Sequence, residues 1–183
     1  MEILFIRHGE KEKGIENPGI TKKGIKQVKY LNKKLKKQKF DELYCSDKLR
    51  AKQTAAYVSK VVKLKPKVEE SLNEFDGEVI KTPQKHWNKE QKEKYSKLKI
   101  FLKSFTEKAN SNKRILIVAH GNTNRLILAL LLELELKNLI RLQQSETAMN
   151  EIYWVERFGN WRLRYWNDTS HLTKKLLGKE KDF

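Results

Sequence analysis

Hydrophobic positions along the chain follow two patterns, uninterrupted runs and helically spaced stripes. The runs ILFI at 3–6 and RILIVA at 114–119 predict buried strands, and DELYCS at 41–46 and PKVEE at 66–70 predict shorter ones. Apolar residues spaced along two lysine-rich segments predict amphipathic helices, one from Thr21 to near Lys39 and one over 47–62.

The second half of the chain adds a further helix and a hairpin. LILALLLE at 126–133 predicts a helix that follows the 114–119 strand. NEIYWVE at 150–156 and WRLRYW at 161–166 flank RFGN, which predicts a β-hairpin with a glycine turn. Because strands alternate with helices, we expect an α/β fold, a three-layer α/β/α sandwich with a mainly parallel central sheet.

One lysine-rich segment lies outside this alternation. Its last apolar residues, Leu98, Leu102 and Phe105, have helical spacing, so we expect a helical, lid-like insertion at about 83–110. At 183 residues and 21.7 kDa the chain is large enough for one sizeable core. We therefore expect one domain over 1–183.

The charge balance is strongly basic but does not by itself assign a partner. Forty Lys and Arg residues against 23 Asp and Glu give a net charge of +17, which attracts anions. The lysines are scattered over the polar faces of predicted helices, without the interleaved aromatics of an RNA-binding sheet or zinc-finger spacing. We do not expect nucleic acid as a partner.

Other compositional features concern the environment of the protein. No apolar run is long enough for a bilayer span, the start MEILFI lacks the features of a signal peptide, and a single cysteine permits no internal disulfide. We expect a cytoplasmic protein without a membrane partner, either a monomer or a homodimer.

The two clearest strands end in a similar way. ILFI is followed by Arg7, His8 and Gly9, and RILIVA is followed by His120 and Gly121, with each glycine allowing a tight turn. Because ligands of open α/β sheets bind at the carboxyl ends of the strands, we expect both histidines in one pocket. A neutral imidazole is a good nucleophile near pH 7, and arginine binds phosphate oxygens in pairs. The pattern indicates phosphoryl transfer without a metal.

Four ordered motifs carry a resemblance to a known family. LFIRHGE, YCSDKLRAKQTA, LNEFDG and LIVAHGNTNR occur in this order, and PGITKKG and NDTSHL extend the similarity over nearly the whole chain. In this respect the sequence resembles the histidine phosphatase superfamily, which includes the cofactor-dependent phosphoglycerate mutases. The resemblance implies a phosphoglycerate mutase-like fold and a small phosphorylated substrate.

The resemblance also implies a role for each motif residue. His8 resembles the phosphorylated nucleophile, with Arg7 and Arg50 as phosphate ligands. His120 resembles the second histidine, which binds the phosphoryl group and its transition state. Glu74 stands in the place of the proton donor, although other carboxylates follow and precede it closely: Glu69, Glu70, Asp76 and Glu78.

Further positions resemble the substrate-binding residues of the family. Gly121 and Asn122 begin the last long helix, where the backbone amide of Asn122 is an anion donor. Lys11 stands where relatives have a small residue, and Asn17 is a candidate replacement for an asparagine that relatives carry at the place of Gly14. Asp47 replaces a frequent proline, and we expect its carboxylate to cap the following helix. The residues that we expect to contact substrate are therefore Arg7, Lys11, Asn17, Arg50, Gly121 and Asn122.

Two rival chemistries fit the residues poorly. Cysteine-based phosphatases place five residues between the nucleophile and the phosphate-binding arginine, whereas four separate Cys45 from Arg50. No pair among the four histidines has helix-compatible zinc spacing. We expect neither a metal nor a cofactor.

We therefore expect a metal-independent phosphomonoesterase of the histidine acid phosphatase type. Its intermediate is a phosphohistidine on His8, and Glu74 is the general acid and base. The short segment between Glu74 and the 114–119 strand favours hydrolysis, whereas LNE and HGNTNR resemble the mutase versions of these motifs. A phosphoglycerate mutase dependent on 2,3-bisphosphoglycerate is the alternative, followed by a non-catalytic module that binds phosphate or a polyanion.

Overall fold

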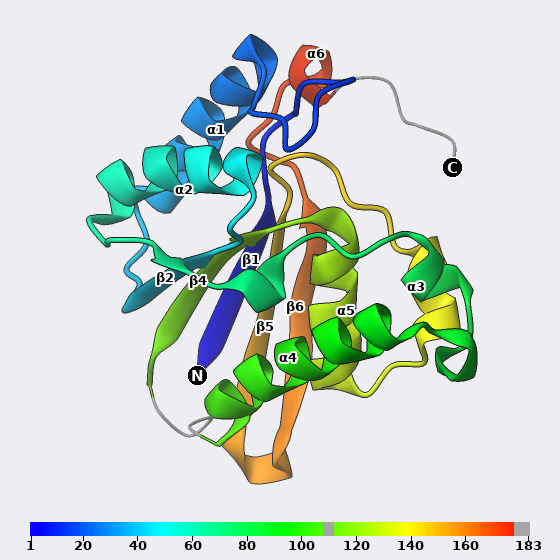
Figure 1. Ribbon diagram of the computed structural model, residues 1–183. Coiled ribbons are helices and arrows are strands. Elements are labelled where there is room, and N and C mark those ends of the chain that lie inside the picture. The colour runs from blue at the N-terminus through cyan, green and yellow to red at the C-terminus, as the bar shows by residue number, and fades with distance from the viewer. Residues whose placement is uncertain (108–111, 178–183) are drawn as a thin grey trace.

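A six-stranded sheet forms the centre of the protein (Figure 1). The computed structural model describes residues 1–107 and 112–177. The strand order is β3-β2-β4-β1-β5-β6, with β3, β2, β4 and β1 parallel and β5 antiparallel to both of its neighbours. The strands are β1 (Glu2–Arg7), β2 (Glu42–Cys45), β3 (Lys67–Val68), β4 (Arg114–Ala119), β5 (Met149–Val155) and β6 (Asn160–Asp168).

Helices cover both faces of this sheet. The helices are α1 (Lys22–Leu35), α2 (Leu49–Val62), α3 (Glu78–Lys81), α4 (Lys89–Thr106), α5 (Gly121–Leu132) and α6 (Lys174–Leu177). Short 3₁₀ turns are η1 (Glu70–Leu72), η2 (Gln84–His86), η3 (Leu136–Arg141) and η4 (Glu156–Phe158). Figure 1 shows α1 and α2 on one face and α4 and α5 on the other.

The alternation of side chains along β1 explains the two layers of helices. Leu4 and Ile6 belong to the cluster beneath α1 and α2, whereas Ile3 and Phe5 belong to the cluster beneath α4 and α5. Successive residues of a strand point to opposite faces, so a fully apolar strand supplies both cores. The prediction of an α/β sandwich with a mainly parallel sheet is confirmed.

Helix boundaries differ from the predicted ones at two places. Helix α1 ends at Leu35 instead of near Lys39, because the apolar stripe has no member one turn beyond Leu35. Helix α5 begins at Gly121, as the role expected for the Asn122 amide requires, five residues before the apolar run at 126–133 from which the helix was predicted. Its first turns contain buried polar residues, Thr123 and Asn124, which a search for apolar spacing does not detect. The predicted hairpin is present as β5 and β6, and Gly159 takes a φ of 59° in its turn.

The lysine-rich segment at about 83–110 forms η2 and α4, and its residues 108–110 lie outside the described part of the chain. Asn88 and Gln91 form a capping box at the start of α4. Leu98, Leu102 and Phe105 are buried in the same cluster as α5, so this helix is a core layer of the fold. None of the described helices is long and apolar enough to cross a membrane.

Candidate active site

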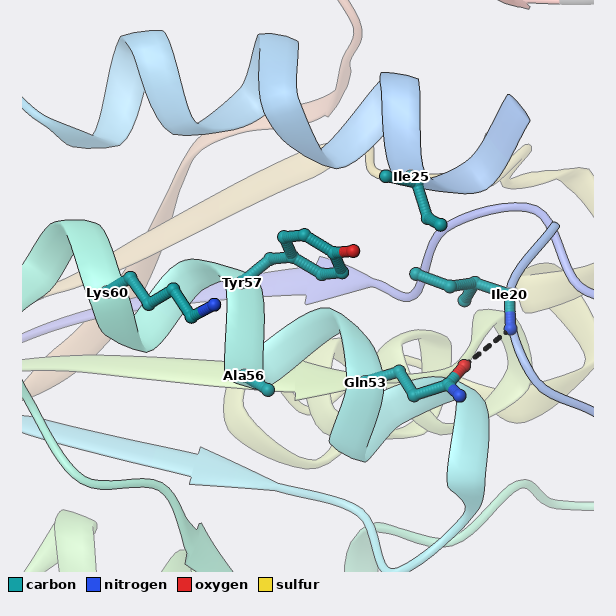
Figure 2. Close-up of a pocket in the computed structure, with 6 residues that line it drawn as sticks. All are labelled: Ile20, Ile25, Gln53, Ala56, Tyr57 and Lys60. Atoms are coloured by element: carbon teal, nitrogen blue, oxygen red, sulfur yellow. Dashed lines mark hydrogen bonds between the residues drawn. The ribbon is translucent and has the colours of Figure 1, made fainter. Parts of the chain in front are cut away.

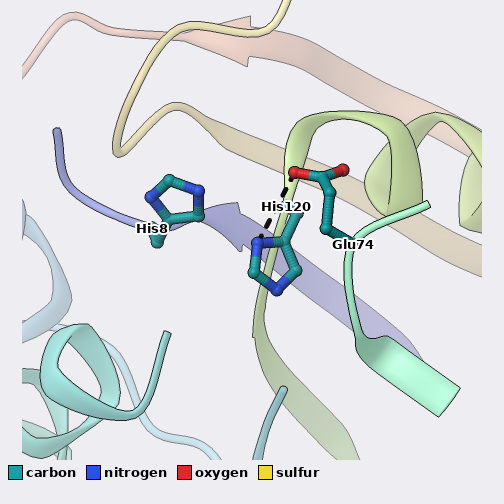
Figure 3. Close-up of side chains that lie close together, drawn as sticks. All are labelled: His8, Glu74 and His120. Carbon is teal, nitrogen blue, oxygen red and sulfur yellow. Dashed lines mark ion pairs between the residues drawn. The ribbon is translucent and has the colours of Figure 1, made fainter. Parts of the chain in front are cut away.

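Two neighbouring strands bring the two predicted histidines together. Arg7 at the end of β1 pairs with Ala119 at the end of β4, and the His8 backbone N–H donates to the Ala119 carbonyl over 3.0 Å. The rings of His8 and His120 follow directly, with centroids 5.1 Å apart (Figure 3). The expected meeting of both histidines at one sheet edge is therefore observed.

His8 is buried and held in one tautomer. Its Nδ1–H donates to the carbonyl oxygen of Gly9 over 2.7 Å, while its Nε2 accepts from the Nε–H of Arg50 over 3.1 Å. The second of these bonds places a lone pair on Nε2. Burial, followed by the charge of Arg7, holds the pKa of His8 well below 6.5. Nε2 is thus an unprotonated nitrogen at neutral pH.

Gly9 fixes the loop after His8 through close packing. A Cβ at Gly9 would lie 2.9 Å from the carbonyl oxygen of Gly24 at the start of α1. The Gly9 N–H donates to Thr54 Oγ1 over 3.1 Å, and this hydroxyl donates to the Arg50 carbonyl. The φ of Gly9 is not positive, so this glycine does not supply a left-handed conformation. It is required for the approach of two backbones.

His120 is held from behind by a chain of hydrogen bonds. Asn73 Oδ1 accepts from the backbone N–H of Asp47 over 3.0 Å, and also from the Ser46 hydroxyl over 2.7 Å. Because Ser46 has given its only proton to Asn73, its oxygen must accept from Nε2–H of His120, 2.7 Å away. The neutral ring therefore presents an unprotonated Nδ1.

Glu74 faces that nitrogen. One carboxylate oxygen lies 3.6 Å from Nδ1 of His120 (Figure 3). The same oxygen lies 4.0 Å from Nη2 of Arg50, and the other oxygen accepts from the backbone N–H of Asn122 over 3.1 Å. Burial raises the pKa of Glu74, against the opposing effect of Arg7. The side chain is 31% exposed, so water reaches it. A carboxyl group with a raised pKa at the mouth of a site is suited to donate a proton.

The neighbouring carboxylates are engaged elsewhere. The Glu69 side chain accepts from Ser71 N–H, that of Asp76 accepts from Glu78 N–H, and Glu78 pairs with Lys81. Glu70 is the first residue of η1. Of these acidic side chains, Glu74 is the one whose oxygen lies within 4 Å of His120.

Arg7 and Arg50 surround the pocket with positive charge. Arg50 is almost fully buried, and burial lowers its pKa. Arg7 Nη1 donates to the Gln144 carbonyl, and its Nη2 lies 3.4 Å from a Glu146 carboxylate oxygen. Gly121 lies beside Arg7, because a Cβ there would be 3.7 Å from Nε. The Arg7 guanidinium and the start of α5 are thus neighbours, and together with Arg50 they place positive charge beside His8 and His120.

The loop residues predicted to touch substrate lie less centrally. Lys11 is exposed, and its charge contributes to the low pKa of His8. Asn17 has a φ of 47°, and its Oδ1 accepts from the N–H of Leu49, the first residue of α2. Asn17 thereby caps that helix. The prediction that Asp47 caps it is wrong, since the Asp47 carboxylate pairs with Lys52 over 2.8 Å.

The same groups have a geometry that a metal could use. Ligand atoms of His8, Glu74 and His120 lie within 4.8 Å of one another. Arg7 and Arg50 place two fixed positive charges beside them, which oppose a cation and attract an anion. Cys45 is buried at the end of β2, and burial raises its pKa to about 11, so it is a poor nucleophile.

Several residues that hold the site were not singled out from the sequence. Ser46 and Asn73 set the tautomer of His120, and Thr54 orients the loop after His8. Ser46 directly follows β2, so its place at the carboxyl edge of the sheet was a usable signal. Lys94 of α4 donates to the Glu74 carbonyl over 2.5 Å, and nothing in its local pattern predicts this.

A separate pocket of about 320 Å³ lies between α1 and α2 (Figure 2). At its edge Gln53 Oε1 accepts from the N–H of Ile20, which ties α2 to the loop before α1. The pocket contains none of the predicted catalytic residues, and its lining consists of Ile20, Ile25, Gln53, Ala56, Tyr57 and Lys60.

Comparison with known protein families identifies the group to which this site belongs. A family model described as the histidine phosphatase superfamily (branch 1) matches residues 3–107 and 97–169. The chain belongs to the histidine phosphatase superfamily. The resemblance found in the four motifs is therefore confirmed.

The relatives compared with this chain share between 17% and 28% of its residues. It is 28% identical over 182 residues to the "Putative phosphoserine phosphatase 2" of Hydrogenobacter thermophilus, covering 82% of this chain and 88% of the relative. A mutant phosphoserine phosphatase of Entamoeba histolytica, solved in complex with phosphoserine, matches with a TM-score of 0.75 at 22% sequence identity. The match covers 94% of this chain and 99% of the Entamoeba one. A mycobacterial glucosyl-3-phosphoglycerate phosphatase, solved with inorganic phosphate, matches with a TM-score of 0.74 at 17% sequence identity. The match covers 94% of this chain and 99% of the mycobacterial one. The two structures establish the fold.

Proposed function

We propose that this protein is a phosphomonoesterase that hydrolyses a small phosphorylated metabolite through a phosphohistidine on His8. The observation that carries the proposal is the placement of His8 Nε2. This unprotonated nitrogen is bonded to the buried Arg50, and the ring of His120 lies beside the His8 ring. The other ring nitrogen of His8, Nδ1, is bonded to the Gly9 carbonyl. Membership of the histidine phosphatase superfamily supports the same conclusion.

In the first step, substrate binds with its phosphoryl group between Arg7, Arg50 and His120. Arg50 exchanges its Nε–H hydrogen bond to His8 for one to a phosphoryl oxygen and keeps the proton, which frees the lone pair of His8 Nε2 to attack phosphorus. A nitrogen–phosphorus bond forms as the ester oxygen–phosphorus bond breaks. Glu74 donates its proton to the leaving oxygen, so the alcohol departs neutral.

In the second step, water attacks the phosphorus of the phosphohistidine. Glu74, now ionised, accepts a proton from this water, and Nε2 of His8 is released together with inorganic phosphate. The exposed third of the Glu74 side chain gives water a route to the intermediate, which favours hydrolysis. Transfer to a second position of a bound phosphoglycerate, as in a mutase, would require this route to be closed.

The names of relatives suggest which substrates to assay first. One relative is named as a phosphoserine phosphatase, and a solved neighbour binds phosphoserine. We infer that phosphorylated small acids deserve priority over sugar phosphates and nucleotides. A mutase reaction remains the second candidate, because the LNE and HGNTNR motifs resemble the mutase forms.

Hydrolysis of p-nitrophenyl phosphate with excess chelator tests the proposal. The His8→Ala variant should lose turnover, whereas His86→Ala, which removes an exposed histidine on η2, should retain it. A His8→Ala protein that keeps full activity would refute the mechanism. If the wild type shows no turnover, interconversion of phosphoglycerates with added bisphosphoglycerate examines the second candidate.

A further inference from the structure

A lysine of α4 is bonded to the backbone of the residue that carries the catalytic carboxylate. The Lys94 ammonium group donates to the backbone carbonyl of Glu74 over 2.5 Å, and it lies 4.8 Å from the ring centroid of Phe75. The side chain is half-buried. Its ammonium group is thereby held against the segment that presents Glu74.

Among the described residues, this ammonium group forms no ion pair within 4.0 Å. The carboxylates whose charges act on it at longer range are those of Glu74, first, and then Glu90 and Asp76. Its hydrogen bond to Glu74 goes to a neutral carbonyl oxygen and uses one of three N–H donors. A half-buried cation that is bonded only to a neutral acceptor retains capacity for an anion.

The position of Lys94 relative to the reacting atoms determines which part of the substrate it can contact. His8 and the two arginines receive the phosphoryl group, whereas Glu74 must lie on the side of the leaving oxygen. Lys94 approaches from the Glu74 side, and its charge contributes to lowering the pKa of both Glu74 and His120. If Glu74 protonates the leaving oxygen, a cation on this side of the site is nearer to the organic part of the substrate than to its phosphoryl group.

We propose that Lys94 binds a carboxylate carried by the leaving alcohol, which makes phosphorylated hydroxy acids the preferred substrates. This inference rests on the proposed phosphatase function and adds the class of substrate. A substrate carboxylate a few bonds from the ester oxygen would accept hydrogen bonds from the Lys94 N–H groups that are not bonded to the Glu74 carbonyl. Lys94 is thus a specificity-determining residue, distinct from the groups that bind phosphate.

O-phosphoserine and O-phosphoethanolamine form a matched pair for the test, because they differ only by the carboxylate. The wild type should prefer O-phosphoserine. Lys94→Gln should reduce kcat/KM for O-phosphoserine by about tenfold or more beyond its effect on O-phosphoethanolamine, in keeping with loss of one charge-assisted bond. Lys94→Arg should preserve the preference. Lys97→Gln, at an exposed position of the same helix, is the matched control.

Three results would overturn the inference. An equal loss for both substrates would mean that Lys94 only supports the Glu74 carbonyl. A wild type without preference, or one that hydrolyses p-nitrophenyl phosphate but neither member of the pair, would also contradict it. Absence of p-nitrophenyl phosphate hydrolysis would instead refute the proposed function, and the inference about Lys94 would fail with it.

Discussion

The hydrogen bond behind His120 provides a quantitative prediction for Ser46→Ala. Phosphoryl binding brings negative charge to His120, which favours the doubly protonated ring, with Nδ1–H toward the phosphoryl group and Nε2–H toward Ser46. The Nε2 to Oγ distance is 2.7 Å, and both residues are buried. Loss of a buried hydrogen bond to a charged group costs about 1.5–3 kcal/mol. Because the neutral ring already donates to Ser46, a bond worth about 0.5–1.5 kcal/mol, the loss specific to the protonated ring is about 1–1.5 kcal/mol, which lowers kcat/KM by about five- to tenfold.

The same change should shift the pH dependence in a defined direction. In the free protein, burial first and then the neighbouring His8, Arg50 and Arg7 hold the pKa of His120 well below 6.5. A bound phosphate raises this pKa, and activity declines where rising pH removes the second proton. Ser46 accepts from Nε2–H in both protonation states but more strongly from the doubly protonated ring, so without Ser46 this decline should move to lower pH by about one unit.

Steady-state kinetics over pH 5–9 measure both effects, with thermal unfolding as the check on folding. Asn73→Asp keeps an oxygen acceptor for the Ser46 hydroxyl and should retain most of the activity, whereas Asn73→Ala should resemble Ser46→Ala. A folded Ser46→Ala protein with activity within twofold of wild type would refute the reasoning. So would a uniform loss with no change in the pH profile.

Two further substitutions examine the acid and the loop after His8. Glu74→Gln should reduce turnover of alkyl phosphates by about 10²–10⁴-fold, and much less for p-nitrophenyl phosphate, whose leaving group needs no proton; equal losses for both would argue against Glu74 as the acid. Gly9→Ala should lower the free energy of unfolding by about 1–3 kcal/mol, because its Cβ would lie 2.9 Å from the Gly24 carbonyl oxygen. Gly14→Asn, at an open position with a φ of 69°, is the control, and an equal melting temperature for both variants would contradict the packing argument.

The location of the site could be predicted because each of the two strand–histidine segments is recognisable from a few consecutive residues. Each apolar run ends in a histidine, and parallel pairing of β1 with β4 places both ends at one edge of the sheet. The alternation of strands and helices was enough to predict that these two strands are parallel members of one sheet. Arg50 and Glu74 were located by motif resemblance, since neither has a distinctive local pattern.

Contacts between segments distant in the sequence could not be predicted in this way. Asn17 caps α2 across 32 residues, and the Gly9 backbone packs against Gly24. Helix α5 starts early because its polar first turns face the buried site. Lys94 reaches Glu74 from a helix that reads as a solvated lysine-rich surface. Each feature depends on packing that periodicity does not encode.

Direct detection of the phosphorylated residue tests the central claim. Enzyme quenched in alkali during turnover of p-nitrophenyl phosphate, then fragmented and examined by mass spectrometry, should carry phosphate on His8 that is lost in acid. The His8→Ala variant should carry none. Phosphate on another residue of the turning-over enzyme, or turnover by His8→Ala at the wild-type rate, would contradict the phosphohistidine mechanism.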